Sequence, residues 1–270
     1  MERIIFKLED VEYMYPQGIK GIKNATFQVK QSDTIAVLGP NGSGKSTLLK
    51  ILDGLYEPCR GRFYAFGEKI SANKLKDRNF NRFFRKNVGM LFQDVEAQLF
   101  SPTVYDEVAF SPRQLGLNED EIKKRVSDIA ALLGIEKIMD RYPHSLSTGE
   151  KRKVAIAAVF SFDPQVYLLD EPTANIDPKT EGVLIDLILA SKQKGRTVIV
   201  ATQDLLLADH FAERVILIDD TRQVVAFEDK KKAFSDTKLL YKLGLMHSHK
   251  KIHKFFTTYI HSHIILGKKD

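Results

Sequence analysis

Short apolar runs recur along the chain, and stretches with helical spacing of apolar residues separate many of them. Runs of this length without polar alternation are typical of strands that are buried on both faces of a parallel sheet. We expect such strands at residues 34–38, 88–92, 166–169, 197–201 and 215–218. Alternation of strands and helices predicts an α/β fold with a mainly parallel sheet.

The N-terminal part shows a different pattern, in which apolar and polar residues alternate. This period of two is typical of strands with one face exposed. Residues 4–15, 25–30 and 62–66 are therefore expected to form a smaller antiparallel sheet.

Strand patterns disappear between Gln93 and Asp163, where apolar residues instead follow helical spacing. We expect helices at residues 103–115, 119–133 and 147–160, the second ending at Gly134 and the third capped by Ser147. This predicts a helical subdomain at about residues 94–163, inserted into an α/β domain of residues 1–235.

A glycine-rich loop follows the first expected buried strand and opens a helix at residues 45–55. It matches the P-loop pattern, in which backbone N–H groups form an anion-binding concavity at a helix N-terminus. Lys45 supplies a charge for the β- and γ-phosphates, and the Ser46 hydroxyl is a Mg²⁺ ligand in this pattern. The candidate nucleotide-binding residues are Gly39, Pro40, Asn41, Gly42, Ser43, Gly44, Lys45, Ser46 and Thr47.

Two adjacent carboxylates, Asp170 and Glu171, end the expected strand at residues 166–169. Asp170 is a candidate Mg²⁺ ligand, and Glu171 is then free to orient or deprotonate an attacking water. Acidic pairs at strand ends are often only helix caps or solvated turns. The P-loop upstream and Pro172-Thr173 downstream favour the catalytic interpretation.

Bulk composition limits the other possibilities. The 43% hydrophobic and 28% charged residues are ordinary for a globular protein, and a single cysteine, Cys59, excludes an intrachain disulfide. No apolar run reaches about eighteen residues and the first residues lead into no signal-type core, so we expect any membrane role to be peripheral.

The net charge of +6 raises the possibility of nucleic-acid binding, but the basic residues gather at residues 74–86 and near the C-terminus. Residues 79–85 can face phosphates, anionic lipid or an acidic partner. The favoured interpretation is a solvated excursion with a few buried aromatic side chains.

Together the motifs resemble an ABC-type ATPase over about residues 4–230. The resemblance is carried by the P-loop, then Leu-Ser-Thr-Gly-Glu at residues 146–150, then Asp170 and Glu171. It implies the ABC ATPase fold, ATP and Mg²⁺ as cofactors, and a head-to-tail dimer with an identical or homologous second ATPase subunit. In that dimer Ser147 and Gly149 would complete the nucleotide site of the partner.

The resemblance also implies roles for three residues that have plainer interpretations. Gln93 would contact the metal and water, although a glutamine after a strand is most often a surface residue. Asp177 would cross the dimer interface and, with Pro178, also suits a helix N-cap. Tyr15 would stack on adenine, or it would pack on Pro16 at a sheet edge.

Residues 92–110 are similar to the cobalt/nickel and energy-coupling-factor importer ATPases. This segment implies an integral membrane transporter subunit as a partner, a peripheral location on the cytoplasmic side of the cell membrane, and cobalt, nickel or a vitamin-like micronutrient as cargo. No nucleic acid is expected. The alternative is a soluble ABC ATPase acting on nucleic acid or ribosomes, which usually carries coiled-coil insertions or two ATPase cassettes that are missing here.

Three positions depart from the family pattern. Thr148 replaces a glycine, and Glu150 replaces glutamine in a place where the helix dipole tolerates a carboxylate. Gln203 stands where the family carries a histidine, and glutamine donates a hydrogen bond but cannot become cationic. We therefore expect firm ATP binding with slow hydrolysis, as in a regulatory subunit of a heterodimeric transporter.

The expected C-terminal tail, residues 236–270, carries five histidines: His247, His249, His253, His261 and His263. His249 and His253 would share one face of a helix, a geometry that can chelate a metal ion. The favoured alternative is an amphipathic helix that packs in a dimer or partner contact, because histidine clusters without other ligands are weak evidence for a metal site.

Overall fold

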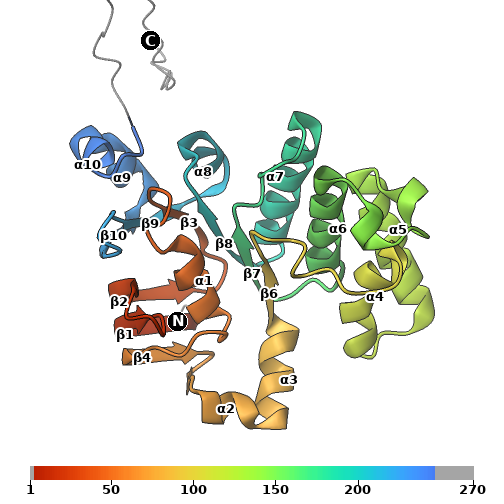
Figure 1. Ribbon diagram of the computed structural model, residues 1–270, viewed down its shortest axis with the longest axis horizontal. Coiled ribbons are helices and arrows are strands. Elements are labelled where there is room, and N and C mark those ends of the chain that lie inside the picture. The colour runs from red at the N-terminus through yellow and green to blue at the C-terminus, as the bar shows by residue number, and fades with distance from the viewer. Residues whose placement is uncertain (1–2, 247–270) are drawn as a thin grey trace, which may run out of the picture.

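The computed structural model describes residues 3–246, which form an α/β structure around a six-stranded sheet of order β10-β9-β3-β8-β7-β6 (Figure 1). The α/β prediction is confirmed. All five expected buried strands are present, and neighbouring strands within this set of five pair in parallel. They are β3 (Thr34–Leu38), β6 (Val88–Leu91), β7 (Val166–Asp170), β8 (Thr197–Thr202) and β9 (Arg214–Ile218).

Both faces of this sheet are covered, which explains why its strands read as unbroken apolar runs. Along β3, Ile35 and Val37 enter one core, whereas Ala36 and Leu38 enter the other. The first core is closed by α1 (Lys45–Leu52), and the second by α6 (Thr148–Ser161), α7 (Pro178–Gln193) and α8 (Leu205–Phe211).

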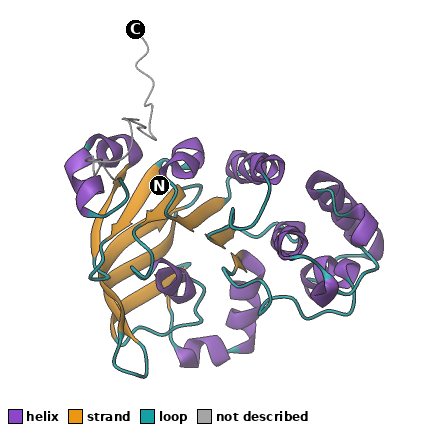
Figure 2. Ribbon diagram, turned by 45° about the horizontal axis from the view of Figure 1, so that its top comes forward, coloured by secondary structure: helices purple, strands orange, loops and turns teal. Residues whose placement is uncertain are grey.

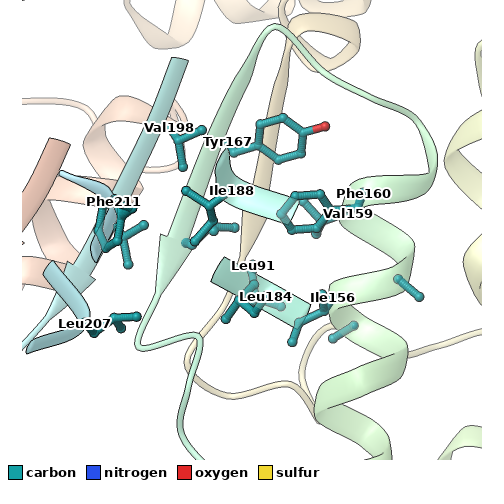
Figure 3. Packing of buried hydrophobic residues seen from close by; sticks show 14 of the residues in the cluster. Leu91, Ile156, Val159, Phe160, Tyr167, Leu184, Ile188, Val198, Leu207 and Phe211 are labelled. Carbon is teal, nitrogen blue, oxygen red and sulfur yellow. The ribbon is translucent and has the colours of Figure 1, made fainter. Parts of the chain in front are cut away.

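Figure 3 shows the second core, where Ile156, Val159 and Phe160 of α6 pack toward the sheet. The Phe160 ring stacks on that of Tyr167 from β7, with centroids 4.6 Å apart. This packing attaches α6 directly to the strand that ends in Asp170.

The predicted antiparallel sheet is also present, with strand order β2-β1-β4-β5. Its strand β2 begins at Lys20 rather than at residue 25, and the short β5 was not expected. Helix α1 lies between this sheet and the main one (Figure 1). The strands are β1 (Ile4–Met14), β2 (Lys20–Lys30), β4 (Arg60–Ala65) and β5 (Glu68–Lys69).

The segment between β6 and β7 is helical and lies to one side of the sheet (Figures 1 and 2). Thr103, Asn118 and Ser147 cap its three α-helices through their side chains, and Gly134 ends the second with a φ of 66°. The elements are α4 (Val104–Gln114), α5 (Glu119–Leu133), the 3₁₀ turns η1 (Glu136–Ile138) and η2 (Pro143–Ser145), and α6.

The basic segment before β6 forms two helices that the sequence pattern did not reveal, α2 (Ala72–Lys76) and α3 (Arg78–Asn87). Phe80 and Phe84 of α3 are buried in the first core, as expected of an excursion with a few buried aromatics. Arg85 also donates to the Asp53 carboxylate at 2.8 Å, which ties α3 to the end of α1. Burial raises the pKa of Asp53 to about 6, although Arg85 opposes the shift.

The described chain closes with β10 (Val224–Asp229), an unpredicted antiparallel edge strand, followed by α9 (Lys230–Ser235) and α10 (Thr237–Lys242). The histidines of the expected tail lie outside the described residues. Within residues 3–246, no helix combines the length and apolar character needed to cross a bilayer.

Candidate nucleotide-binding site

The glycine-rich loop joins the end of β3 to the start of α1 and leaves the first N–H groups of that helix without a side-chain cap. Gly44 precedes the helix with a φ of 102°, a conformation that side chains rarely adopt. A Cβ on Gly44 would also lie only 2.3 Å from the carbonyl oxygen of Gly21. The loop therefore presents uncapped backbone donors at a helix N-terminus, the arrangement that binds phosphate.

Lys45 is buried and lies over the loop. Its Nζ donates to the carbonyl oxygens of Gly39 at 2.9 Å and Pro40 at 3.3 Å. The same ammonium is 3.4 Å from a carboxylate oxygen of Glu171. The P-loop lysine and the candidate catalytic carboxylate thus lie at the same point of the site.

The two carboxylates at the end of β7 differ in environment. Asp170 is buried, which raises its pKa, while a hydrogen bond from Ser46 opposes that shift. Its Oδ1 has no hydrogen-bond partner among the described residues. Glu171 is partly exposed and adopts a φ of 43°, with its N–H bonded to the Ala201 carbonyl at 2.9 Å.

A buried carboxylate oxygen without a partner beside a serine hydroxyl is a set of hard oxygen donors. Ser46 and Asp170 line one cavity together with Gln93, whose side chain supplies a further oxygen. These three residues, the predicted metal ligands, fit a Mg²⁺ ion in the chemistry of their donor atoms.

The P-loop, Tyr15 and Glu171 surround a cavity of about 370 Å³. The Tyr15 hydroxyl is 2.7 Å from the Thr47 hydroxyl, and its ring meets those of Tyr13 and Tyr56 edge-on. The residues that line this cavity are Tyr15, Gly21, Asn41, Gly42, Gly44, Lys45, Ser46, Thr47, Gln93, Glu171 and Arg222.

Two of these lining residues, Gly21 and Arg222, were missed in the sequence. Arg222 lies in the turn between β9 and β10 with a φ of 67°, and its guanidinium donates to the carbonyl oxygens of Gly42 and Lys20. It sits almost 180 residues beyond the P-loop in a segment with no recognisable motif. Only the three-dimensional fold brings this second cation to the cavity.

Gln93 links that cavity to a second one, of about 760 Å³, on the side of α6. Its backbone carbonyl accepts a hydrogen bond from Arg152 at 2.8 Å. The second cavity is lined by Ser46, Lys50, Leu55, Tyr56, Phe92, Gln93, Asp94, Ala97, Arg152, Asp170, Ala174 and Asn175.

The segment at residues 146–150 contributes to neither cavity. Ser147 is exposed at the start of α6, where it forms a capping box with Glu150. The Glu150 carboxylate accepts from the Ser147 N–H at 2.9 Å and hydroxyl at 2.7 Å, which lowers the pKa of Glu150. A Cβ on Gly149 would lie 3.1 Å from the Asn175 carbonyl oxygen. Thr148 is exposed.

Asp177 and Gln203 also lie outside the cavity that contains Lys45. Asp177 caps α7 by accepting from the Thr180 N–H at 3.0 Å, and Lys153 of α6 is 3.1 Å away. These bonds hold the pKa of Asp177 far below its usual range. Gln203 is exposed after the end of β8, between the strands that lead to the P-loop and to Glu171.

Several known proteins are similar to this chain in sequence and in structure. A family model described as ABC transporter matches residues 22–174. The energy-coupling factor transporter ATP-binding protein EcfA of Methanothermobacter thermautotrophicus is 36% identical over 241 residues, which cover 89% of this chain and 76% of that protein.

Two solved structures are similar over most of their length. One is cbiO1 from Clostridium perfringens, part of the ABC transporter complex cbiONQ, with a TM-score of 0.71, 34% identity, and coverage of 90% of this chain and 96% of that one. The other is the ATP-binding cassette MJ0796 in a dimeric post-hydrolysis state with ADP and Pi, with a TM-score of 0.75, 29% identity, and coverage of 84% and 99%.

The donor set predicts a specific effect of removing one charge. Asp170→Asn keeps the size of the side chain and should abolish the gain in ATP affinity that Mg²⁺ provides, about tenfold or 1.4 kcal/mol. The melting temperature of the Asp170→Asn protein without nucleotide should not fall below that of the wild type, because burial disfavours the charged Asp170 carboxylate. Calorimetric titration with ATP, in Mg²⁺ or in EDTA, measures the effect.

Asp53→Asn is the matched control, since it removes another buried carboxylate that lines neither cavity. An Asp170→Asn protein that still binds ATP more tightly in Mg²⁺ than in EDTA would contradict the assignment.

Proposed function

The chain belongs to the ABC transporter family of ATPases, and on that premise we propose that it energises a membrane importer through a head-to-tail dimer. The observation that carries the proposal is the separation of the site into two parts. One cavity holds P-loop residues with Gln93 and Glu171, while Ser147 and Gly149 lie outside it at the start of α6, where Ser147 is exposed and Gly149 is partly exposed. A second chain that presents these residues would close the cavity over ATP.

Within this proposal, the described residues divide the work on ATP. The uncapped N-terminus of α1 and Lys45 hold the phosphates, and Tyr15 presents an aromatic ring to the adenine. Ser46, Asp170 and Gln93 would hold Mg²⁺, which supplies charge neutralisation at the β- and γ-phosphate oxygens when bound.

Glu171 is the residue proposed to act on the attacking water. Its carboxylate is partly exposed to the cavity and 3.4 Å from the Lys45 ammonium. A phosphate that enters the loop would compete with Glu171 for this ammonium, and a released carboxylate can orient or deprotonate water. Lys45 thus serves first as a partner of Glu171 and then as a ligand of the phosphates.

The dimer partner is proposed from the same geometry. Ser147 caps α6 and Asp177 caps α7, and both are exposed. Lys153 of α6 pairs with Asp177, and a Cβ on Gly149 would lie 3.1 Å from the Asn175 carbonyl, so the two helix starts are neighbours. These two helix starts form one surface that would face the P-loop of a partner. The dimeric cassette with ADP and Pi supports such an assembly by similarity.

The membrane partner is proposed from the surface of α4 and the loop before it. Phe100 is 63% exposed and Phe110 39% exposed, with their rings edge-on and 4.9 Å apart. Exposed aromatic pairs of this kind are typical anchors of protein interfaces. Similarity to EcfA and to a subunit of cbiONQ supports an importer and a peripheral place on the cytoplasmic face of the membrane, with a transition-metal ion or a vitamin-like micronutrient as cargo.

A pull-down from native membranes tests the importer. In mild detergent the wild-type chain should capture an integral membrane protein, and Phe100→Asp should reduce the capture by at least about tenfold because a charge enters an apolar contact. Leu206→Asp is the control, since Leu206 is 53% exposed on α8. Capture of nucleic acid or ribosomes instead of a membrane protein would favour the soluble ABC ATPase.

Gln203 favours a second candidate, a subunit that binds ATP firmly and hydrolyses it slowly. It lies at the end of β8, which pairs with both β3 and β7, whose ends carry the P-loop and Glu171. An amide at this place donates one hydrogen bond but cannot share a proton with the γ-phosphate.

The variant Gln203→His should therefore raise steady-state ATP hydrolysis by at least about tenfold, since a positioned acid–base group contributes roughly 100-fold or more, and leave ATP affinity unchanged. Phosphate release by the purified chain measures this, with Gln193→His at the end of α7 as the control. An unchanged rate in Gln203→His would show that the amide does not limit hydrolysis.

A further inference from the structure

Arg152 of α6 is almost fully buried, with 2% of its surface exposed, yet it forms no ion pair among the described residues. Its guanidinium instead donates to three backbone carbonyl oxygens. Nη1 reaches Phe92 at 2.9 Å, Nη2 reaches Gln93 at 2.8 Å, and Nε reaches Ala174 at 3.3 Å. Burying a cation without a paired carboxylate costs desolvation free energy, which hydrogen bonds to main-chain carbonyls offset only in part. Packing alone does not explain an arginine at this position.

The three carbonyls belong to the two segments that carry the chemistry of this chain. Phe92 and Gln93 form the segment after β6, and Ala174 lies three residues beyond Glu171. Burial lowers the pKa of Arg152, and the nearby carboxylates of Asp170 and Glu171 oppose this shift. Through its three hydrogen bonds, the guanidinium connects both Gln93 and the segment after Glu171 to the same position on α6.

Arg152 is also rigidly connected to Ser147. Arg152 lies five positions after Ser147, about one and a half turns along the helix that Ser147 caps. Because α6 is a single hydrogen-bonded helix, a displacement of its N-terminus would also displace Arg152.

The flanking residues of α6 reinforce the same connection. Lys151 pairs with Glu96, three residues after Gln93, and Lys153 pairs with Asp177, six residues after Glu171. Three consecutive basic residues thus hold both catalytic segments to the helix, with the buried Arg152 in the middle.

We propose that Arg152 is a positioning residue that couples the two ATP sites of the dimer. This inference rests on the proposed head-to-tail assembly, in which Ser147 contacts the nucleotide held by the partner. That contact shifts α6, and Arg152 carries the shift to Gln93 and to Glu171 in the site of its own chain. Occupation of one site thereby sets the hydrolytic geometry of the other.

The chemistry of the side chain suits this task. A planar guanidinium spans three acceptors in fixed directions, whereas a lysine ammonium is a point charge on a flexible stem. Arg152→Lys keeps the positive charge and most of the volume but loses the fork. The substitution therefore separates coupling by geometry from simple electrostatics.

Steady-state ATP hydrolysis by the purified chain as a function of ATP concentration tests the proposal. The wild type should show positive cooperativity, with a Hill coefficient above 1 and up to about 2 for two coupled sites. Arg152→Lys should bring the coefficient to about 1 and lower kcat roughly 10- to 100-fold, because a small misplacement of catalytic groups is costly. ATP affinity measured in EDTA should stay within about twofold, since Arg152 lines the cavity of the proposed Mg²⁺ ligands but not the P-loop cavity.

Arg125→Lys is the matched control, because Arg125 likewise donates to a backbone carbonyl, that of Ser161, at 3.3 Å at the C-terminal end of α6. It should retain cooperativity and kcat. If Arg152→Lys fails to fold, Arg152→Gln replaces it, since the amide can still donate to one of the carbonyls.

Three results would overturn the coupling role: a wild-type Hill coefficient of 1, an unchanged coefficient in the variant, or parallel losses of melting temperature and ATP affinity. The measurement needs no membrane subunit. A chain that hydrolyses ATP cooperatively but captures no membrane protein would refute the proposed importer and leave the coupling intact.

Discussion

The burial of the main sheet on both faces is the constraint from which the site follows. Because alternate residues of each strand enter two separate cores, polar side chains have no place along the strands except at their ends. The carboxyl ends of β3, β8, β7 and β6 lie side by side in that order. They bring together the P-loop, Gln203, the Asp170–Glu171 pair and Gln93, which are distant in sequence.

Those strand ends supply negative charge and backbone donors, and the cations come from other elements. Lys45 belongs to α1, Arg222 to the turn before β10, and Arg152 to α6. Each of the three donates to main-chain carbonyls, so each holds a loop in place as well as contributing charge. The site is thus an acidic strand edge surrounded by cations that also fix its loops.

Much of this arrangement was predictable from the sequence, because the chemistry lies in contiguous motifs with clear periodicity. The P-loop, the strand before Asp170 and the helix capped by Ser147 each combine a local pattern with an unambiguous physical requirement. Arg152 and Arg222 could not be identified in this way, since both act through contacts with residues about 20 to 200 positions away. Buried aromatic side chains were expected in the segment before β6, but its helices α2 and α3 were missed because α2 buries none of its residues and α3 buries only Phe80 and Phe84.

In the proposed dimer, the ATP site of one chain is completed by the Ser147 segment of another. Light scattering of Glu171→Gln with MgATP measures this most directly, because blocked hydrolysis should trap the closed state. The mass should rise from that of one 30.7 kDa chain to twice that value, and adding Ser147→Arg should keep the chain monomeric without loss of ATP binding. A chain that stays monomeric at saturating ATP, or a dimer that tolerates Ser147→Arg, would contradict it.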